Sequence, residues 1–187
     1  KQYPKEQLLK FTKMQVPEKE ENDVAESITR IIESIGEDPK RDGLSGTPER
    51  ITKMYKEMFR GYDKEQKPKI TIFKNGSDGL IYDEMIIDRG DFYSQCEHHM
   101  VPFFGNYWFA YIPDKKIVGL SKVARIVDYY SAKLQVQERL VKEILDELEK
   151  ELDPLGIALI MEGEHLCKTM RGVRKKGKMT TVDLRGV

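Results

Sequence analysis

Cysteine and histidine, which often bind transition metals, are confined to two short windows of this chain of 187 residues. Cys96, His98 and His99 lie in the first window, and His165 and Cys167 lie in the second. These are all the cysteines and histidines of the chain, and scattered structural ones would seldom leave the remainder without either. Because thiolate sulfur and imidazole nitrogen together favour zinc, the placement predicts one zinc site.

The spacing within each window fits a shared ion. A Cys-x-x-His pair can hold an ion from a turn, and His165 and Cys167 would share one face if they lay on a strand. Five donors exceed what a closed tetrahedral site needs. If Cys96, His99 and Cys167 bind the metal, the fourth position is left to water, as in catalytic zinc sites. His98 and His165 would then be available for proton transfer.

Two other interpretations use the same residues. One is a structural site of two cysteines and two histidines that keeps one histidine spare. The other is a redox-active pair of Cys96 and Cys167. Two cysteines are too few for a disulfide framework, and their position beside histidines favours reduced, metal-binding thiols.

The elements that must position these donors follow from the hydrophobic periodicity. Helices come first, then strands, then helices and strands again, so the fold class is predicted as α+β with a mostly antiparallel sheet. The second helix is expected to be capped by Thr47, with Pro48 at its first helical position. The expected elements are helices over 24–35 and from 47 to about 61, strands over 70–73, 85–87, 103–112, 157–161 and 180–184, and a helical stretch from 121 that bends at 134–137.

The composition of the chain changes twice along its length. Residues 1–23 are polar and rich in lysine, which predicts an arm. Residues 24–64 carry the two early helices and are expected to form a helical region. Residues 65–187 contain both metal-binding windows and are expected to form the catalytic domain.

The total charge gives no argument for nucleic acid or membrane binding. Lysine plus arginine and aspartate plus glutamate both number 32, so the formal net charge is zero. No apolar run approaches the roughly 20 residues that span a bilayer, and no signal core occurs at the start. A soluble cytoplasmic protein is expected. The basic cluster at 174–178 is interpreted as a solvated loop, and the aromatic run at 107–111 as core and interface.

Beyond this spacing, the residues around the windows resemble the GTP cyclohydrolase I family. The resemblance covers about residue 24 to the end and includes several blocks in the same order as in the family. They are TPER at 47–50 with KMY at 53–55, SQCEHHMVPF at 94–103, GLSKVARIV at 119–127, LQVQERL at 134–140, HLC at 165–167 and MRGV at 170–173.

The resemblance implies a reaction, a fold and an assembly. The family converts GTP and water into formate and 7,8-dihydroneopterin triphosphate, the entry to folate and other pterins. Its tunnelling fold is an antiparallel sheet with two helices on one face, here with an N-terminal helical extension. Subunits join into pentameric rings, two rings stack into a homodecamer, and active sites lie at subunit boundaries.

The resemblance also implies roles near the metal. Cys96, His99 and Cys167 resemble the zinc ligands, and His98 and His165 resemble the groups that move protons while the imidazole ring of guanine is opened at C8. Glu138 resembles the residue that anchors guanine, since a carboxylate can accept from N1–H and the 2-amino group together. Gln137 is expected to assist it.

Basic residues are implied to hold the triphosphate. Lys122 and Arg125 lie three apart at a helix start and therefore share a face. Ser121 resembles a ribose contact. Arg171 and Arg50 resemble further triphosphate contacts, with Arg50 expected from a neighbouring subunit.

One departure and two alternative functions remain at this point. Val182 stands in the last strand where the family carries a hydroxyl. One alternative is a non-catalytic, zinc-stapled interaction protein, which would leave Lys122, Glu138 and Arg171 without a shared purpose. The other keeps the tunnelling fold but acts on another purine or pterin.

Overall fold

A computed structural model describes residues 18–186. They fall into two compact units, one ending at residue 65 and the other beginning at residue 66. The expectation of an arm over 1–23 falls largely outside the described residues. Residues 18–23 are helical, because the first described helix spans Glu18–Ser34 and so includes residues before Val24.

The first unit is built from two helices, α2 (Glu18–Ser34) and α3 (Thr47–Met58), and a short 3₁₀ turn at Arg60–Tyr62. A second 3₁₀ turn, Lys64–Gln66, lies at the boundary between the two units. Lys56 of α3 forms an ion pair with Glu21 of α2. Within the range 24–35 that was expected to be helical, Ile28 and Ile32 are buried. Ile31 and Ile35 are more than half exposed. The N-cap of α3 is Gly46 rather than Thr47, and Pro48 lies in the first turn.

The second unit is organised by a sheet of five strands in the order β5-β2-β3-β6-β7. Three of its four strand pairings are antiparallel: β2 with β3, β3 with β6 and β6 with β7. The fourth is parallel and joins the short β5 to β2. The strands are β2 (Ile86–Cys96), β3 (Pro102–Ile112), β5 (Leu134–Gln135), β6 (Gly156–His165) and β7 (Lys178–Gly186). A separate pair joins β1 (Ile72–Lys74) to β4 (Lys116–Val118).

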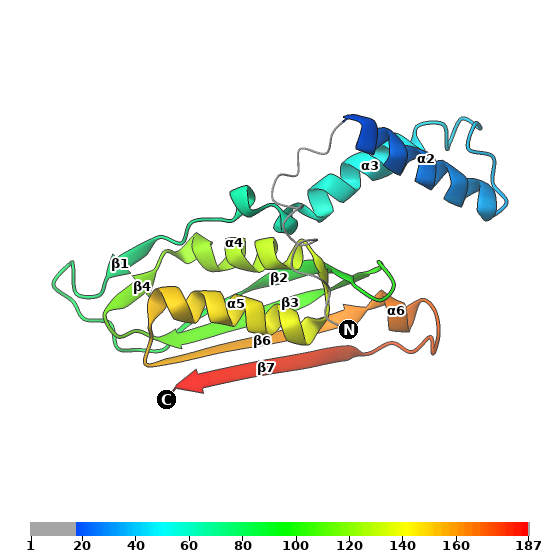
Figure 1. Cartoon of the computed structure of the whole chain (residues 1–187). Coiled ribbons are helices and arrows are strands. Elements are labelled where there is room, and N and C mark those ends of the chain that lie inside the picture. The colour runs from blue at the N-terminus through cyan, green and yellow to red at the C-terminus, as the bar shows by residue number, and fades with distance from the viewer. Residues whose placement is uncertain (1–17, 187) are drawn as a thin grey trace, which may run out of the picture. The chain divides into compact units, whose positions relative to one another are not determined.

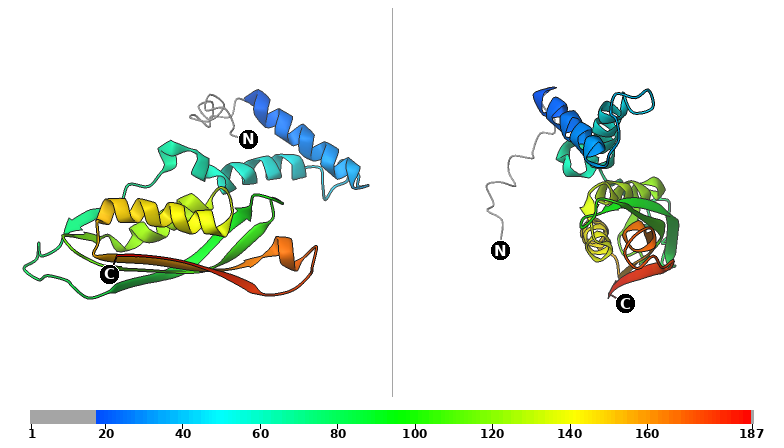
Figure 2. Two further views of the ribbon diagram at one scale, coloured as in Figure 1. Left: turned by 60° about the horizontal axis from the view of Figure 1, so that its bottom comes forward. Right: turned by 90° about the vertical axis from the view of Figure 1, so that its right-hand side faces the viewer.

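Two helices, α4 (Leu120–Ser131) and α5 (Gln137–Leu152), lie on the same face of this sheet (Figure 1). The end-on view in Figure 2 shows the sheet curving around them. Alternate residues of the strands point toward the helices and fill the core, and the aromatic residues of β3 contribute four of its largest side chains. They are Phe103, Tyr107, Phe109 and Tyr111. The apolar face of α5 is wholly covered, with Leu140, Ile144, Leu145, Leu148 and Leu152 at 0% exposure.

The α+β class, the antiparallel sheet and the two helices on one face are confirmed, as is the subunit architecture of the tunnelling fold. Several boundaries were wrong. The strand expected at 85–87 continues to Cys96, and β4 was not expected. The expected bend at 134–137 is a break between two helices, because residues 134–135 pair with β2.

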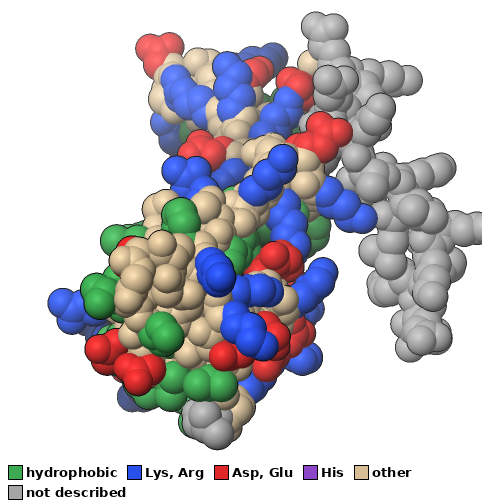
Figure 3. Space-filling model, turned by 90° about the vertical axis from the view of Figure 1, so that its left-hand side faces the viewer, with side chains coloured by type: hydrophobic (Ala, Val, Ile, Leu, Met, Phe, Trp, Pro, Cys, Tyr) green, Lys and Arg blue, Asp and Glu red, His purple; other side chains and the backbone are tan. Residues whose placement is uncertain are grey.

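The surface is mixed in charge. Figure 3 shows lysine, arginine and acidic side chains interspersed over one face of the molecule, as the equal totals of both signs lead one to expect. Within residues 18–186, no helix has the length and apolar character that crossing a bilayer requires.

Candidate metal centre and its surroundings

The first window lies where β2 ends and turns into β3. Cys96 is the last residue of β2, and residues 97–99 form a turn. The backbone N–H of Met100 donates to the carbonyl of Cys96 at 2.8 Å, and the N–H of Cys96 donates to Val101 at 2.9 Å. Met100 adopts a left-handed conformation, with φ of 53°, that closes the turn. The predicted turn is confirmed, and it brings Cys96 and His99 to the same side.

The second window is not a strand throughout. His165 ends β6, and Cys167 lies in the single helical turn α6 (Leu166–Thr169). The expectation that strand alternation places both side chains on one face is therefore wrong. The helical turn instead places Cys167 near the first window. This is possible because β6 pairs with β3 so that His165 lies opposite Phe103, and Phe103 lies opposite Ser94 close to the end of β2.

Three donor atoms from these windows converge. The ligand atoms of Cys96, His99 and Cys167 all lie within 4.8 Å of one another. Nδ1 of His99 is 3.8 Å from Sγ of Cys96. Tetrahedral zinc, with bonds of about 2.3 Å to sulfur and 2.0–2.1 Å to nitrogen, separates such atoms by about 3.6 Å. The described residues thus present a donor set whose chemistry and spacing fit zinc.

His98 lies beside this group but is directed toward solvent. Its side chain is 64% exposed, and its Nδ1 lies 3.9 Å from Sγ of Cys96. His99 is tied in on its other nitrogen, since Nη1 of Arg171 donates to Nε2 at 3.1 Å. The two adjacent histidines therefore differ in their surroundings, and only His99 belongs to the converging group of three donors.

The local environment shifts the pKa values of two groups. Burial lowers the pKa of His165, and Lys168 adds to this effect while Glu138 opposes it. Burial raises the pKa of the Cys167 thiol, and a hydrogen bond with Cys96 raises it further. The Cys167 thiol therefore favours the protonated form, so a metal that binds to it must displace a proton. Both cysteines are free thiols in the structure.

A hydrogen-bonded support holds the first window in place. The backbone N–H of Glu97 donates to the carbonyl of Gln135 on β5 at 3.0 Å. Arg139 of α5 binds the carboxylate of Glu97 and also donates to Oε1 of Gln135 at 2.8 Å and to the carbonyl of Leu134 at 3.0 Å. This support was not predicted from the sequence. The signal available was the pair of glutamines at 135 and 137 within an otherwise apolar run.

Three of the residues implied to bind substrate lie close to the metal-binding group. Gln137 and Glu138 begin α5, and Gln137 contacts the ring of His165 directly. Glu138 is close enough to His165 to influence its pKa. Arg171 contacts His99. The structure therefore brings the guanine-binding and one of the triphosphate-binding candidates to the cysteines and histidines.

The residues at the start of α4 lie elsewhere. This helix runs from the β4 end of the sheet toward the α6 end (Figure 1), and Ser94 fixes its last residue by donating to the carbonyl of Ser131 at 2.8 Å. At 1.5 Å per residue, Lys122 lies about 14 Å back along the helix from Ser131. Cys96 lies two residues after Ser94 on β2, about 7 Å farther toward the α6 end of the sheet, so the two distances add. Ser121 and Lys122 are thus about 20 Å from the cysteines of their own chain, with Arg125 one helical turn nearer.

Arg50 is exposed on α3 in the first unit. Its role as a triphosphate contact stays a prediction.

A cavity of about 470 Å³ adjoins the metal-binding group. His165 and Cys167 line one part of it, and Lys168, Gly177, Lys178 and Met179 line the rest. Lys178 is paired with Glu162 at 2.7 Å. The cavity thus combines the candidate metal ligand and the candidate proton-transfer group with a basic rim, which suits an anionic substrate.

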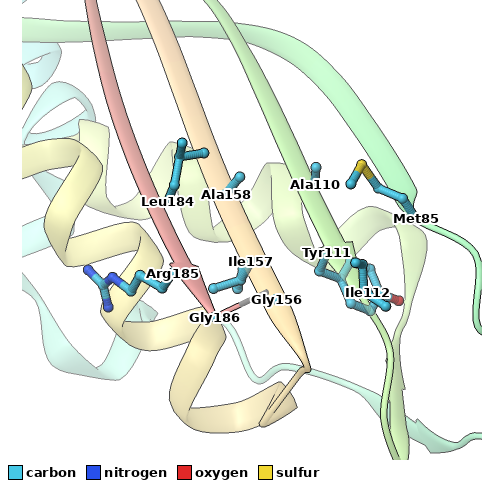
Figure 4. A pocket seen from close by; sticks show the side chains of 10 residues that line it. All are labelled: Met85, Ala110, Tyr111, Ile112, Gly156, Ile157, Ala158, Leu184, Arg185 and Gly186. Atoms are coloured by element: carbon cyan, nitrogen blue, oxygen red, sulfur yellow. The ribbon is translucent and has the colours of Figure 1, made fainter.

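A second pocket, of about 320 Å³, lies at the other end of the same strands (Figure 4). It is lined mainly by apolar side chains, including Ala110, Ile157 and Leu184. Its one charged residue, Arg185, is bound at 2.6 Å to both Asp183 and Glu149. Since this pocket lies at the start of β6 and His165 at its end, it is remote from the donors.

Comparison with known proteins places these features in context. The family described as GTP cyclohydrolase I matches residues 24–187. A protein named GTP cyclohydrolase 1 from Sulfurihydrogenibium sp. (strain YO3AOP1) is 50% identical over 163 residues, which is 86% of this chain and 83% of the relative. One of that name from Clostridium perfringens (strain 13 / Type A) is 48% identical over 165 residues, 87% of each chain. A weak similarity, with a TM-score of 0.45 and 14% identity, extends to the solved structure of the archaeosine synthase QueF-Like in the apo form, over 55% of this chain and 94% of that chain.

Proposed function

Because this chain belongs to the GTP cyclohydrolase I family, we propose that it hydrolyses GTP, opens the imidazole ring of guanine, releases formate and yields 7,8-dihydroneopterin triphosphate. The observation that carries this proposal is the convergence of Cys96, His99 and Cys167 beside His165, Glu138 and a cavity with a basic rim. This arrangement joins a catalytic type of metal site to groups for proton transfer and purine recognition.

The metal is proposed to be zinc, held by Cys96, His99 and Cys167. Two sulfur atoms and one imidazole nitrogen are ligands that zinc prefers, and three protein ligands leave a coordination position open. When bound there, zinc acts as a Lewis acid and supplies a nucleophile from water at neutral pH.

The residues around this group then have separate tasks. The carboxylate of Glu138, exposed in the first turn of α5, is proposed to accept from N1–H and the 2-amino group of guanine. His98 and His165 are proposed to move protons as the ring opens and formate leaves. Arg171 is proposed to bind triphosphate. A metal on Nδ1 of His99 leaves Nε2 as an N–H, which a guanidinium cannot bond, so Arg171 is then free to bind phosphate.

The active site is proposed to be shared between subunits of a homodecamer made of two pentamers. Ser121, Lys122 and Arg125 lie about 15–20 Å from the cysteines along their own α4, whereas Gln137 and Arg171 contact the histidines of the metal-binding windows directly. A neighbouring copy can supply these residues, and Arg50 is proposed to come from a neighbour as well. We also assign the enzyme to the cytoplasm, since a reducing compartment keeps the two free thiols available for zinc.

The activity is tested with the purified, zinc-loaded protein and GTP. Formate and the fluorescence of neopterin triphosphate are measured together, and ATP serves as the control nucleotide. Formate from GTP but not from ATP is the expected result. A protein that holds zinc at one ion per chain and forms neither product from GTP would contradict the proposal. Cys167→Ser is expected to lose both the zinc and the products.

Shared sites are tested by mixing two inactive variants. Lys122→Glu impairs the α4 side of a site, and His165→Ala impairs the metal side. If each site takes these parts from different chains, an equal mixture reassembled from dissociated subunits recovers about a quarter of the wild-type activity. If both parts belonged to one chain, the mixture would be as inactive as either variant alone.

A further inference from the structure

The imidazole of His165 is held on two sides by residues that are not metal ligands. Its ring is stacked on Phe103, with the centroids 4.6 Å apart and the planes within 6°. Nε2 lies 2.9 Å from Oε1 of Gln137. The stacking fixes the plane of the ring, and the contact with Gln137 fixes its rotation within that plane.

The orientation of the Gln137 amide is determined by its other contacts. Nε2 of Gln137 lies 2.9 Å from the carbonyl oxygen of Met161 and 3.0 Å from that of Met179. A carbonyl oxygen only accepts, so the NH₂ end must face these two strands and the oxygen must face His165. The hydroxyl of Thr181 lies 3.1 Å from the same nitrogen.

This orientation specifies the tautomer of His165. Because Oε1 of Gln137 can only accept, Nε2 of His165 must carry a hydrogen. In the neutral ring Nδ1 is then the nitrogen with the free lone pair. The bond from Nε2–H to Gln137 and the stacking on Phe103 thus hold the ring while Nδ1 stays unprotonated.

Gln137 is also closely enclosed. The residue is only 1% exposed. Both hydrogens of its NH₂ group are donated to the carbonyls of Met161 and Met179. A Cβ added at Gly163 would lie only 2.7 Å from Oε1 of Gln137. The glycine therefore provides the space that the oxygen occupies beside His165.

We propose that Gln137 is a positioning residue that holds His165 as the Nε2–H tautomer, so that Nδ1 is the atom that exchanges protons with the substrate. The part of this inference that concerns proton exchange with the substrate rests on the proposed function. The tautomer itself follows from the hydrogen bonds alone. Holding His165 gives the Gln137 side chain a task other than the expected assistance in guanine binding, because its NH₂ group is bonded to two strand carbonyls and its oxygen faces His165.

The tautomer is measured directly by solid-state NMR of sedimented, zinc-loaded protein labelled with ¹⁵N and ¹³C in histidine only. The chain has three histidines, and His165→Ala identifies the signal that disappears. The expected signal has a protonated Nε2 and an unprotonated Nδ1. In Gln137→Leu, the same residue is expected to show a mixture of tautomers. An Nδ1–H tautomer in the wild type, or an unchanged signal in Gln137→Leu, would overturn the proposal.

Kinetics of two further variants separate positioning from general stability. Gly163→Ala pushes the Gln137 oxygen away from His165 without removing a polar group. It is expected to lower kcat by about tenfold or more and to leave KM for GTP within about twofold. The matched control, Thr181→Val, removes a contact to the other end of the same amide and is expected to keep both constants within about twofold. A rise in KM without a loss of kcat in Gly163→Ala would indicate guanine binding and refute positioning.

The two proposals can fail separately. If the wild type formed no product from GTP, the proposed reaction would be wrong, yet the NMR result would still decide the tautomer. If the enzyme were active with His165 as the Nδ1–H tautomer, the reaction would stand and the role of Gln137 would be wrong.

Discussion

Replacing Arg139 with leucine is predicted to weaken metal binding although Arg139 touches no metal ligand. Arg139 holds the turn that carries Cys96 and His99 by binding Glu97, while two further hydrogen bonds tie it to Gln135 and Leu134. Leucine retains much of the apolar stem but none of these bonds. The turn then keeps its backbone contacts and loses its link to α5.

The magnitude follows from these three contacts. The bonds to Gln135 at 2.8 Å and to Leu134 at 3.0 Å have neutral acceptors and contribute about 1 kcal/mol each. The pair with Glu97 adds little, because the side chains are 42% and 32% exposed and solvent screens them. The predicted loss is about 2 kcal/mol in the free energy of unfolding. With an m-value of about 2 kcal/mol/M, the urea midpoint falls by about 1 M.

The assay measures stability and metal affinity together. Urea unfolding is followed by circular dichroism at one protein concentration, since assembly couples stability to concentration. Zinc affinity is measured by competition with a chromophoric chelator and is expected to fall by about tenfold, at the lower end for residues that orient metal ligands. Lys142→Leu is the control on the same helix, because its pair with Asp146 at 3.2 Å is exposed. If Arg139→Leu bound zinc as tightly as Lys142→Leu, the turn would not depend on this arginine.

Three further variants, with one control, test other parts of the structure. His98→Ala is expected to keep zinc but lose turnover, measured by metal analysis and product formation, and loss of the metal would show that the ligand assignment is wrong. Burial and a hydrogen bond to a carboxylate raise the pKa of Tyr107, so the folded state keeps this proton at a pH where the unfolded chain loses it. Stability should therefore fall above about pH 10, and less steeply in Tyr107→Phe, as measured by unfolding at about pH 9 and 11. A Cβ at Gly105 would lie 1.9 Å from the backbone oxygen of Glu162. The Gly105→Ala protein should therefore lose the β3–β6 pairing, and its circular dichroism spectrum should lose the signal of the folded protein. Gly119→Ala, whose new atom meets nothing closer than 3.5 Å, should fold normally.

The metal-binding group was predictable because its signal is chemical. Cysteine and histidine were confined to two windows, and the donors of Cys96, His99 and Cys167 do converge. The long amphipathic helix α5 was equally clear, since its apolar positions repeat with helical spacing and are all buried. Both features depend on residue types and local period, which a sequence displays directly.

Other parts depend on pairing between distant segments and were not predictable in the same way. The strand β2 was expected to end at residue 87, yet it continues to Cys96 because β3 pairs with it along its length. The polar alternation after residue 87 gave no apolar run, since one face of this strand is exposed. The placement of Cys167 on a helical turn likewise follows from the chain leaving the sheet after His165.

Residues outside the two metal-binding windows fix the positions of the side chains within them. Gln135 and Gln137 lie two residues apart, yet the first holds the turn of Cys96 through Arg139 and the second holds the ring of His165. Both glutamines are 1% exposed, and both use their amides fully because a buried amide without partners would be costly. The segment between α4 and α5 thus fixes the first metal-binding window and the proton-transfer histidine at the same time. A shift of this segment would move both together. A short strand paired with β2, rather than the bend in a helical stretch that the sequence predicted, separates the two helices and holds the segment in place.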